Sequence, residues 1–257
     1  MFIYNLNFCN FMVDNITKNI KKLVEENERV GSYNKIVPSI IKKGIEKVNL
    51  DMFDHETRDG LLNAAGDEFF KRGDYTQAVK AYALTKNITM LNNIGDEYSG
   101  RGQFKEAVEI YSLAYNFSND KNKLITCGEK CLVESHLSDA LRAFSTLKDE
   151  ARLLKLGEVC LEKEKTDVAI EVFAILSNTD RLTKIGDKCL SESRYSYAAR
   201  AYELAGDKNK LSQLGDALLK AGLLGSAYKV YESAENKMMI DFIKENFSEE
   251  QLGRFYA

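Results

Sequence analysis

The sequence predicts an all-α protein, a right-handed α-solenoid of stacked antiparallel helical hairpins. Three observations support this fold class. The 257 residues contain one proline and no tryptophan, so almost nothing interrupts helix formation. A glycine returns at a nearly constant interval, and the same small and aromatic residues follow each copy. Each copy holds two amphipathic segments separated by a turn signal, which is the pattern of one helical hairpin.

The repeat is defined by a glycine that returns every 29 residues, with one interval of 33 residues. The six glycines are Gly66, Gly95, Gly128, Gly157, Gly186 and Gly215. An alanine follows each glycine after twelve residues, at Ala78, Ala107, Ala140, Ala169, Ala198 and Ala227. An aromatic residue follows after sixteen, at Tyr82, Tyr111, Phe144, Phe173, Tyr202 and Tyr231. An apolar residue precedes each glycine by one position and a leucine by four, so the pattern marks an internal repeat.

Counted from the glycine, positions −4, −1 and +3 share one helical face, and +12 and +16 share another, which gives two helices per repeat. Gly73, Gly102 and Gly222 can end the first helix in the left-handed conformation. Asp149 and Asp207 can cap the first helix of the following repeat. Four extra residues after Ala114 lengthen the second helix of that repeat by about one turn, or make its loop bulge.

A glycine inside a helix costs about 1 kcal/mol relative to alanine, so a tight contact has to offset it. We expect the alanine at +12 to let the two helices of a hairpin approach closely at the glycine. The aromatic residue at +16 then fills space toward the neighbouring hairpin. This arrangement predicts that each hairpin buries its apolar face on the next one.

The predicted domain order is an N-terminal extension (1–11), a degenerate N-terminal capping hairpin (12–54), six hairpins (55–235) and a C-terminal capping helix region (236–257). Met12 starts an ordinary amphipathic helix, so the chain before it lies either outside the folded domain or within it. The apolar opening is interrupted by asparagines and is too short to span a bilayer. In the last region lysine replaces the repeat's glycine, and the closing segment SEEQLGRFYA is expected to fold back as a short cap.

The succession of Leu, Gly, aromatic or apolar residue, Ala, aromatic residue, and then Ala or Leu resembles the tetratricopeptide repeat (TPR) over roughly residues 56 to 247. The resemblance implies a TPR-like superhelix that works in protein–protein interaction. Two features depart from that family. Its usual period is 34 residues and a proline often ends its second helix, whereas Pro38 lies outside the repeats here. The shorter unit is similar to the solenoids of vesicle-coat and intraflagellar-transport subunits.

An acidic residue follows every repeat glycine, and these six residues are called the acidic ladder: Asp67, Asp96, Glu129, Glu158, Asp187 and Asp216. By resemblance, this position faces the concave groove, where the ladder, with Asn63 and Asn92 beside it, can bind a basic partner segment. Alternatively, each acid pairs with a basic residue of its own or the adjacent hairpin, for example Lys71, Lys130, Lys188 or Lys220. We favour the second interpretation.

No motif for catalysis, cofactor binding or metal binding is found, so the sequence predicts no enzyme, no cofactor and no metal site. His55 and His136 lack a Cys or His at ligand spacing. Three cysteines, Cys131, Cys160 and Cys189, occupy the apolar +3 position and are expected in the core. Five cysteines without paired spacing predict reduced thiols and a cytoplasmic location.

We therefore expect a non-catalytic, cytoplasmic scaffold that binds a segment or domain of another protein along its groove, without membrane insertion. Two alternatives stay open. A nucleic-acid-binding helical repeat protein is opposed by the acidic ladder and the net charge of −3. A regulatory subunit of an enzyme complex carries no sequence pattern that distinguishes it from a scaffold.

Overall fold

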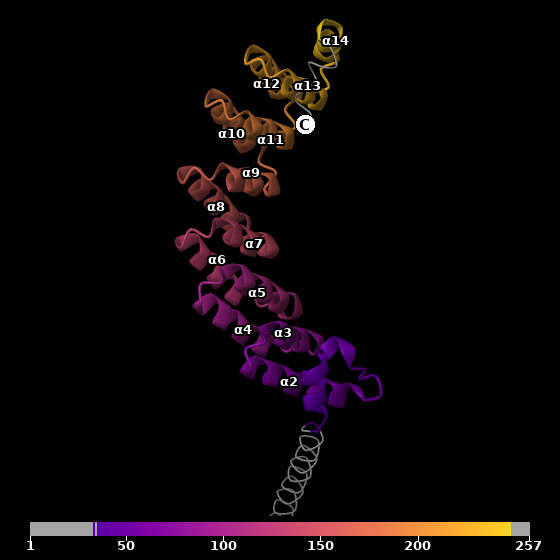
Figure 1. Cartoon of the computed structure of the whole chain (residues 1–257). Helices are drawn as coiled ribbons and strands as arrows, with labels where there is room; N and C mark the ends of the chain where they lie inside the picture. The colour runs from indigo at the N-terminus through magenta and orange to yellow at the C-terminus, as the bar shows by residue number, and fades with distance from the viewer. Residues whose placement is uncertain (1–32, 34, 248–257) are drawn as a thin grey trace, which may run out of the picture. The chain divides into compact units, whose positions relative to one another are not determined.

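The structure is a computed structural model that describes residue 33 and residues 35–247. The chain forms two compact units, divided between Lys123 and Leu124. Within each unit, antiparallel helical hairpins follow one another (Figure 1), and no strand occurs among the described residues. The predicted all-α class and the stacking of hairpins are confirmed within each unit. The predicted extension 1–11, the start of the capping hairpin (12–32) and the closing segment 248–257 lie outside the described residues.

The first unit begins with a helix over residues 35–43, which ends at Gly44 with a φ of +83°. Two hairpins follow it. The elements are η1 (Ile45–Lys47), α2 (His55–Lys71), α3 (Tyr75–Leu84), α4 (Ile88–Gly100), α5 (Phe104–Ser118) and the start of α6 (Asn122–Val133). Ile40 is fully buried in the same core as Leu61 of α2 and Tyr82 of α3. The described end of the predicted capping hairpin therefore packs on the first repeat.

The second unit holds the rest of α6 with its partner α7, then three complete hairpins, and ends with α14. The further elements are α7 (Leu137–Leu147), α8 (Glu150–Glu162), α9 (Thr166–Ile175), α10 (Thr179–Ser191), α11 (Tyr195–Ala205), α12 (Lys208–Lys220), α13 (Leu224–Ser233) and α14 (Lys237–Asn246). The repeat leucines and aromatic residues of this unit, such as Leu182 and Tyr202, are at most 2% exposed. Burial of this shared apolar face stabilises the array.

The turn inside each hairpin contains a residue in the left-handed conformation, seven positions after the repeat glycine. Gly73, Gly102 and Gly222 take this conformation as predicted, with φ values of 76°, 72° and 76°. In the other three hairpins the residue is Ser135, Glu164 or Ser193, with φ values of 67°, 56° and 57°. These three hairpins therefore keep the same turn geometry, although a side chain in the left-handed conformation adds a steric cost.

The predicted helix caps are confirmed. The Asp149 carboxylate accepts a hydrogen bond from the backbone N–H of Arg152 at 3.1 Å. The Asp207 carboxylate accepts one from the backbone N–H of Lys210 at 3.0 Å. These bonds satisfy N–H groups that the first turn of a helix leaves without an internal partner.

The close contact at the repeat glycine differs from the prediction. A methyl group placed on any of the six glycines would lie within 2.7 Å of a ring atom of the aromatic residue at +16 in the same hairpin. The next side chains at Gly66 and Gly128 are alanines at +15, Ala81 and Ala143. The ring at +16 therefore lies on the glycine of its own hairpin, and the expectation that it fills space toward the neighbouring hairpin is wrong. A flat ring fills the space that the missing side chain leaves.

The four extra residues of the second repeat lengthen its second helix. Helix α5 has 15 residues, whereas α3 has 10 and α7 has 11. This difference is about one helical turn, the first of the two predicted alternatives.

Helix α14 has the position of a seventh first helix. Ile243, at position −1, is buried, and the Lys244 ammonium lies 5.8 Å from the ring centre of Tyr228 in α13. A side chain fits at Lys244 because, among the described residues, no further second helix follows to place a ring there.

Candidate functional site

The acidic ladder lies on the first helices of the hairpins, and tyrosine hydroxyls hold four of its carboxylates. In these hairpins the tyrosine ring covers the glycine, and its hydroxyl donates to the aspartate one residue further on. The oxygen–oxygen distances are 2.7 Å for Tyr82–Asp67, 2.7 Å for Tyr111–Asp96, 2.8 Å for Tyr202–Asp187 and 2.6 Å for Tyr231–Asp216. A buried tyrosine needs a partner for its hydroxyl, and this aspartate supplies it.

Four carboxylates of the ladder also pair with a basic side chain on the first helix of the next hairpin, at position −5 of that repeat. The nitrogen–oxygen distances are 2.7 Å for Lys123–Asp96, 2.9 Å for Arg152–Glu129, 2.6 Å for Arg181–Glu158 and 2.7 Å for Lys210–Asp187. Internal pairing is therefore confirmed for these four acids, with partners that the sequence analysis did not name. The predicted partner Lys188 lies 3.9 Å from Glu192 instead.

The aromatic residue, the acid and the base vary together. We call the hairpins with tyrosine at +16 the Tyr hairpins and those with phenylalanine, α6–α7 and α8–α9, the Phe hairpins. Every Tyr hairpin has aspartate in the ladder and both Phe hairpins have glutamate. Where the acid has an ion-pair partner, aspartate pairs with lysine and glutamate with arginine. Phenylalanine needs no acceptor, so its hairpin can carry the longer glutamate, which reaches the arginine of the next hairpin.

The proton equilibria of the ladder fit a structural contact. Burial raises the pKa of Tyr82, Tyr202 and Tyr231, and the adjacent carboxylate raises each further. At Asp187, burial raises the pKa, but hydrogen bonds from Lys210 and Tyr202 outweigh it, so the pKa lies below its usual value. The hydroxyl therefore stays protonated and the Asp187 carboxylate stays ionised near neutral pH.

At both ends of the ladder the base of the next helix is missing. Position −5 is Met90 after Asp67 and Met239 after Asp216, and a thioether forms no ion pair. Among the described residues no basic group lies within 4 Å of either carboxylate, and each accepts its hydrogen bond from tyrosine. Asp67 and Asp216 are therefore the two acids of the ladder that form no ion pair among the described residues.

The predicted groove asparagines have different positions in the packing. The side-chain oxygen of Asn63 accepts hydrogen bonds from Thr85 at 3.0 Å and from Asn87 at 2.9 Å, and Asn87 caps α4. Asn63 therefore links the first two hairpins. Asn92 is half-buried on α4.

The structure adds a surface that the sequence analysis missed, on the second helices of the second unit. A hollow of about 580 Å³ lies between α9 and α11, and one of about 300 Å³ lies between α11 and α13. Glu203 of α11 borders both, and we call the two hollows the second-helix groove. Ile175 and Leu204 line the first hollow and are 48% and 47% exposed. Leu218, Leu223 and Val230 line the second. The sequence signal for the second-helix groove was the apolar residue at position +18 of some repeats, such as Ile175 and Leu204.

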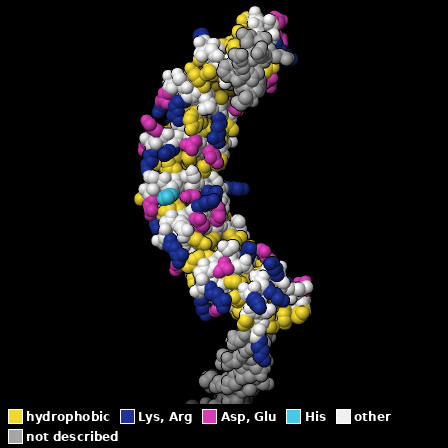
Figure 2. Space-filling model, viewed as in Figure 1, with side chains coloured by type: hydrophobic (Ala, Val, Ile, Leu, Met, Phe, Trp, Pro, Cys, Tyr) yellow, Lys and Arg dark blue, Asp and Glu magenta, His cyan; other side chains and the backbone are white. Residues whose placement is uncertain are grey.

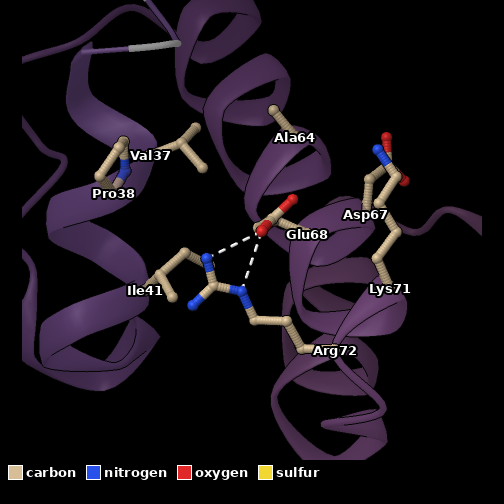
Figure 3. A pocket seen from close by; sticks show the side chains of 8 residues that line it. All are labelled: Val37, Pro38, Ile41, Ala64, Asp67, Glu68, Lys71 and Arg72. Atoms are coloured by element: carbon tan, nitrogen blue, oxygen red, sulfur yellow. Dashed lines mark hydrogen bonds and ion pairs between the residues drawn. The ribbon is translucent and has the colours of Figure 1, made fainter.

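Another hollow, of about 340 Å³, lies in the first unit, between residues 35–43 and α2. Figure 3 shows Val37, Pro38 and Ile41 on one side and Ala64 on the other. Arg72 and Glu68 form an ion pair at its edge, with 2.8 Å between Arg72 Nη2 and Glu68 Oε1.

The described cysteines and histidines do not come together as a metal site. Cys131, Cys160 and Cys189 are buried as predicted, and Cys127 is buried as well. Burial raises the pKa of Cys160 to about 11, so this thiol stays protonated and poorly nucleophilic at neutral pH. Among the described residues no three His, Cys, Asp or Glu side chains lie together as a metal site. The helices of the described part include none that is both long and apolar enough to span a membrane.

Charge is mixed on the face of the molecule that Figure 2 shows. Figure 2 shows Lys and Arg side chains interspersed with Asp and Glu on the visible face. The visible face is therefore not the one-signed basic surface that the backbone of a nucleic acid attracts.

The chain was compared with known proteins and with solved structures. No family model matches the sequence, and no curated protein matches it. The chain is similar to one in the crystal structure of the APC/C hetero-tetramer Cut9–Hcn1, with 14% sequence identity and a TM-score of 0.24. The match covers 88% of this chain and 46% of the other, so the chain spans less than half the length of the protein it matches. The paired helices and the glycine contacts of the hairpins themselves confirm the predicted TPR-like fold.

Proposed function

We propose that the protein is a non-catalytic, cytoplasmic scaffold that binds a segment of another protein in the second-helix groove. The observation that carries this proposal is the exposed pair Ile175 and Leu204, on neighbouring second helices that border a hollow of about 580 Å³. Partly exposed aliphatic side chains beside a hollow are the common anchor of peptide recognition.

The acidic ladder is the weaker candidate for the anchor. A basic partner segment would have to displace the internal lysine or arginine from Asp96, Glu129, Glu158 or Asp187. Only Asp67 and Asp216 offer a carboxylate without that competition. A partner held mainly by the ladder would therefore gain little from its charges at physiological salt.

The groove indicates the chemistry of the segment it binds. Its floor is apolar at Ala174, Ile175 and Leu204, while Glu171 and Arg200 supply one charge of each sign. An amphipathic helix with two apolar anchors and charged flanks fits such a surface. Leu218, Leu223 and Val230 extend the apolar lining beyond Glu203 for a longer segment.

The test compares proteins retained by immobilised full-length chain, by the double variant Ile175→Lys/Leu204→Lys, and by the control Val133→Lys. Val133 is 82% exposed and lies outside the groove. We expect a defined protein that wild type and the control retain at equal levels and the double variant loses. That protein, purified, should then form a stoichiometric complex with the wild-type chain. Equal retention by the double variant contradicts the groove, and steeply salt-dependent binding of RNA or DNA supports the nucleic-acid alternative.

A further inference from the structure

The hollow of about 300 Å³ between α11 and α13 lies beside a small residue of α11. This residue is Ala199, thirteen positions after the repeat glycine, and it lines the hollow. The other five hairpins have a larger residue at this position: Val79, Val108, Leu141, Ile170 and Tyr228. Val108, Leu141 and Ile170 are at most 5% exposed. The short alanine therefore leaves room beside α11 where other hairpins bury a larger side chain.

The next hairpin does not fill this room. Leu218 of α12 stands at position +3, where the three preceding hairpins have cysteine, and the hollow remains although this side chain is larger. Leu218 lines the hollow together with Leu223 and Val230. An apolar lining of this kind can hold a large aliphatic side chain from another molecule.

The second-helix groove has a place for such a side chain on each flank of α11, which lies between α9 and α13 along the array (Figure 1). On the other flank, Ile175 and Leu204 line the hollow of about 580 Å³. Packed helices lie about 8–10 Å apart, so a segment that occupies both hollows needs two apolar side chains at about that spacing. Residues i and i+7 of an α-helix share a face and lie about 10.5 Å apart. Residues on one face of an extended chain lie about 6.6 Å or about 13 Å apart, so the spacing favours a helix that crosses α11.

Glu203 indicates the charge of such a crossing helix. It borders both hollows, so it lies beneath the middle of a helix that runs from one to the other. Its carboxylate accepts a hydrogen bond from the Ser233 hydroxyl at 2.9 Å. Among the described residues it forms no ion pair, although Arg200 is one turn away on α11. Residues i+3 and i+4 lie on the same face as i and i+7, so a lysine or arginine there would meet Glu203.

We propose that the second-helix groove binds an amphipathic α-helix with large aliphatic residues at i and i+7 and a lysine or arginine at i+3 or i+4. One aliphatic side chain contacts Ile175 and Leu204, and the other enters the hollow beside Ala199. This inference rests on the proposed function, because it specifies the segment that the groove binds. A segment of another conformation or charge would leave the proposed function standing and this inference wrong.

The test selects binders from a displayed library of randomised helical peptides, on immobilised full-length chain and on Ile175→Lys/Leu204→Lys. We expect wild type to enrich peptides with two aliphatic residues seven apart and a basic residue between them, and the double variant to enrich none of these. The absence of any peptide that wild type enriches over the double variant contradicts the proposed function itself. Enrichment that needs Ile175 and Leu204 but shows another spacing, or an acidic residue between the anchors, overturns only this inference.

Affinities of the enriched peptide, measured by fluorescence anisotropy, test the two contacts separately. Ala199→Leu fills the second hollow from within the chain and should weaken binding about tenfold, without lowering the melting temperature. Ala151→Leu, the same substitution at an exposed position of α8, is the matched control and should leave binding unchanged. Unchanged binding to a folded Ala199→Leu chain overturns the assignment of the second anchor.

Glu203→Lys is an exposed substitution and keeps the proposal testable if Ala199→Leu lowers the melting temperature. It should weaken binding of the enriched peptide about threefold, and a peptide with glutamate in place of its basic residue should restore the affinity. Equal affinity of both peptides for Glu203→Lys overturns the predicted charge. A wild-type chain that is dimeric, and that Ile175→Lys/Leu204→Lys makes monomeric, assigns the groove to a second copy and overturns the proposal.

Discussion

Hairpins α8–α9 and α10–α11 are neighbours in the second unit and share the contact of an aromatic ring on a glycine, yet they differ at three linked positions. The first uses Phe173, Glu158 and Arg181, and the second uses Tyr202, Asp187 and Lys210. The phenylalanine ring ends in apolar packing. The tyrosine ring ends in a hydroxyl, which reaches the ladder and donates to its aspartate. The choice of acid at the surface is therefore set by the aromatic residue beneath it.

The comparison of the Phe and Tyr hairpins distinguishes an apolar contribution to stability from a polar one. The ring on the glycine contributes apolar burial and is common to both kinds of hairpin. The hydroxyl, carboxylate and ammonium form a charged hydrogen-bond chain that the Phe hairpins replace by a single ion pair. Each contribution can be removed by itself.

The largest effect is expected when the shared contact is blocked. Gly157→Leu and Gly186→Leu should each lower the free energy of unfolding by about 3 kcal/mol, because the new side chain overlaps the ring of Phe173 or Tyr202. Urea unfolding measures this loss. Lys184→Leu, on the exposed face of α10, is the control and should change stability little.

Both glycine variants should lose the same amount of unfolding free energy, because the contact between ring and glycine does not depend on a tyrosine hydroxyl. A loss confined to Gly186→Leu would show that the phenylalanine ring moves aside at no cost. The two kinds of hairpin would then differ in packing as well as in polar chemistry.

Exchanging the aromatic residues is the next largest perturbation. Phe173→Tyr places a hydroxyl beside Glu158, whose carboxylate pairs with Arg181. The substitution should lower the free energy of unfolding by about 1–2 kcal/mol, because the new hydroxyl lacks an acceptor. Adding Glu158→Asp supplies the acceptor found in the Tyr hairpins, and it should recover most of that loss. A double variant less stable than Phe173→Tyr alone would contradict the linkage between the two positions.

The reverse exchange, Tyr202→Phe, removes a hydrogen bond to a carboxylate and should cost about 1.5 kcal/mol. Tyr195→Phe, on the same helix, is the matched control, because Tyr195 makes no hydrogen bond to another described side chain. Thermal unfolding of both variants measures the difference. Equal melting temperatures for the two would show that the Tyr202 hydroxyl contributes nothing.

The pH dependence distinguishes the hydroxyl from the ring. The raised pKa of Tyr202 means that its contribution is complete below about pH 10, the usual tyrosine value, and is lost as pH rises further. The lowered pKa of Asp187 means that its contribution is complete above about pH 4 and is lost below that value. The free energy of unfolding, measured from pH 3 to 11, should therefore differ between wild type and Tyr202→Phe by a constant amount in the middle of the range.

The difference should shrink above about pH 10, by at most about 1.4 kcal/mol per pH unit. Tyr195→Phe should keep the alkaline slope of wild type. A difference between wild type and Tyr202→Phe that stays constant to pH 11 would contradict the raised pKa of Tyr202.

Much of this fold could be predicted from the sequence, because the repeat shows the same local rule six times. The helices, the left-handed glycines and the caps at Asp149 and Asp207 follow from residues within one turn of each other. The contact at the glycine was predicted with the wrong partner. Spacing along a helix shows which residues share a face, but it does not show which of two facing residues lies opposite the gap.

The candidate site was harder to predict, since it depends on contacts between hairpins. The row of acids was visible, but its bases lie on the next repeat, 23 residues further on, or 27 across the insertion. The covariation of tyrosine with aspartate was present in the sequence and would have indicated the hydrogen bond. The second-helix groove left no comparable signal, because position +18 is apolar in only some repeats.

The smallest effect is expected from removing the base alone. Lys210→Met and Arg181→Met copy the methionines that stand at the ends of the ladder, and each should cost less than about 1 kcal/mol. Arg181→Met leaves Glu158 without either partner, whereas Lys210→Met leaves Asp187 with the hydroxyl of Tyr202. The Phe hairpin should therefore lose its whole polar contact and the Tyr hairpin only half of it. Repeating both measurements in 1 M salt should abolish most of the cost, because these side chains are 30–45% exposed. A cost that salt leaves unchanged would mean that the stems of the two bases, rather than their charges, hold the hairpins together.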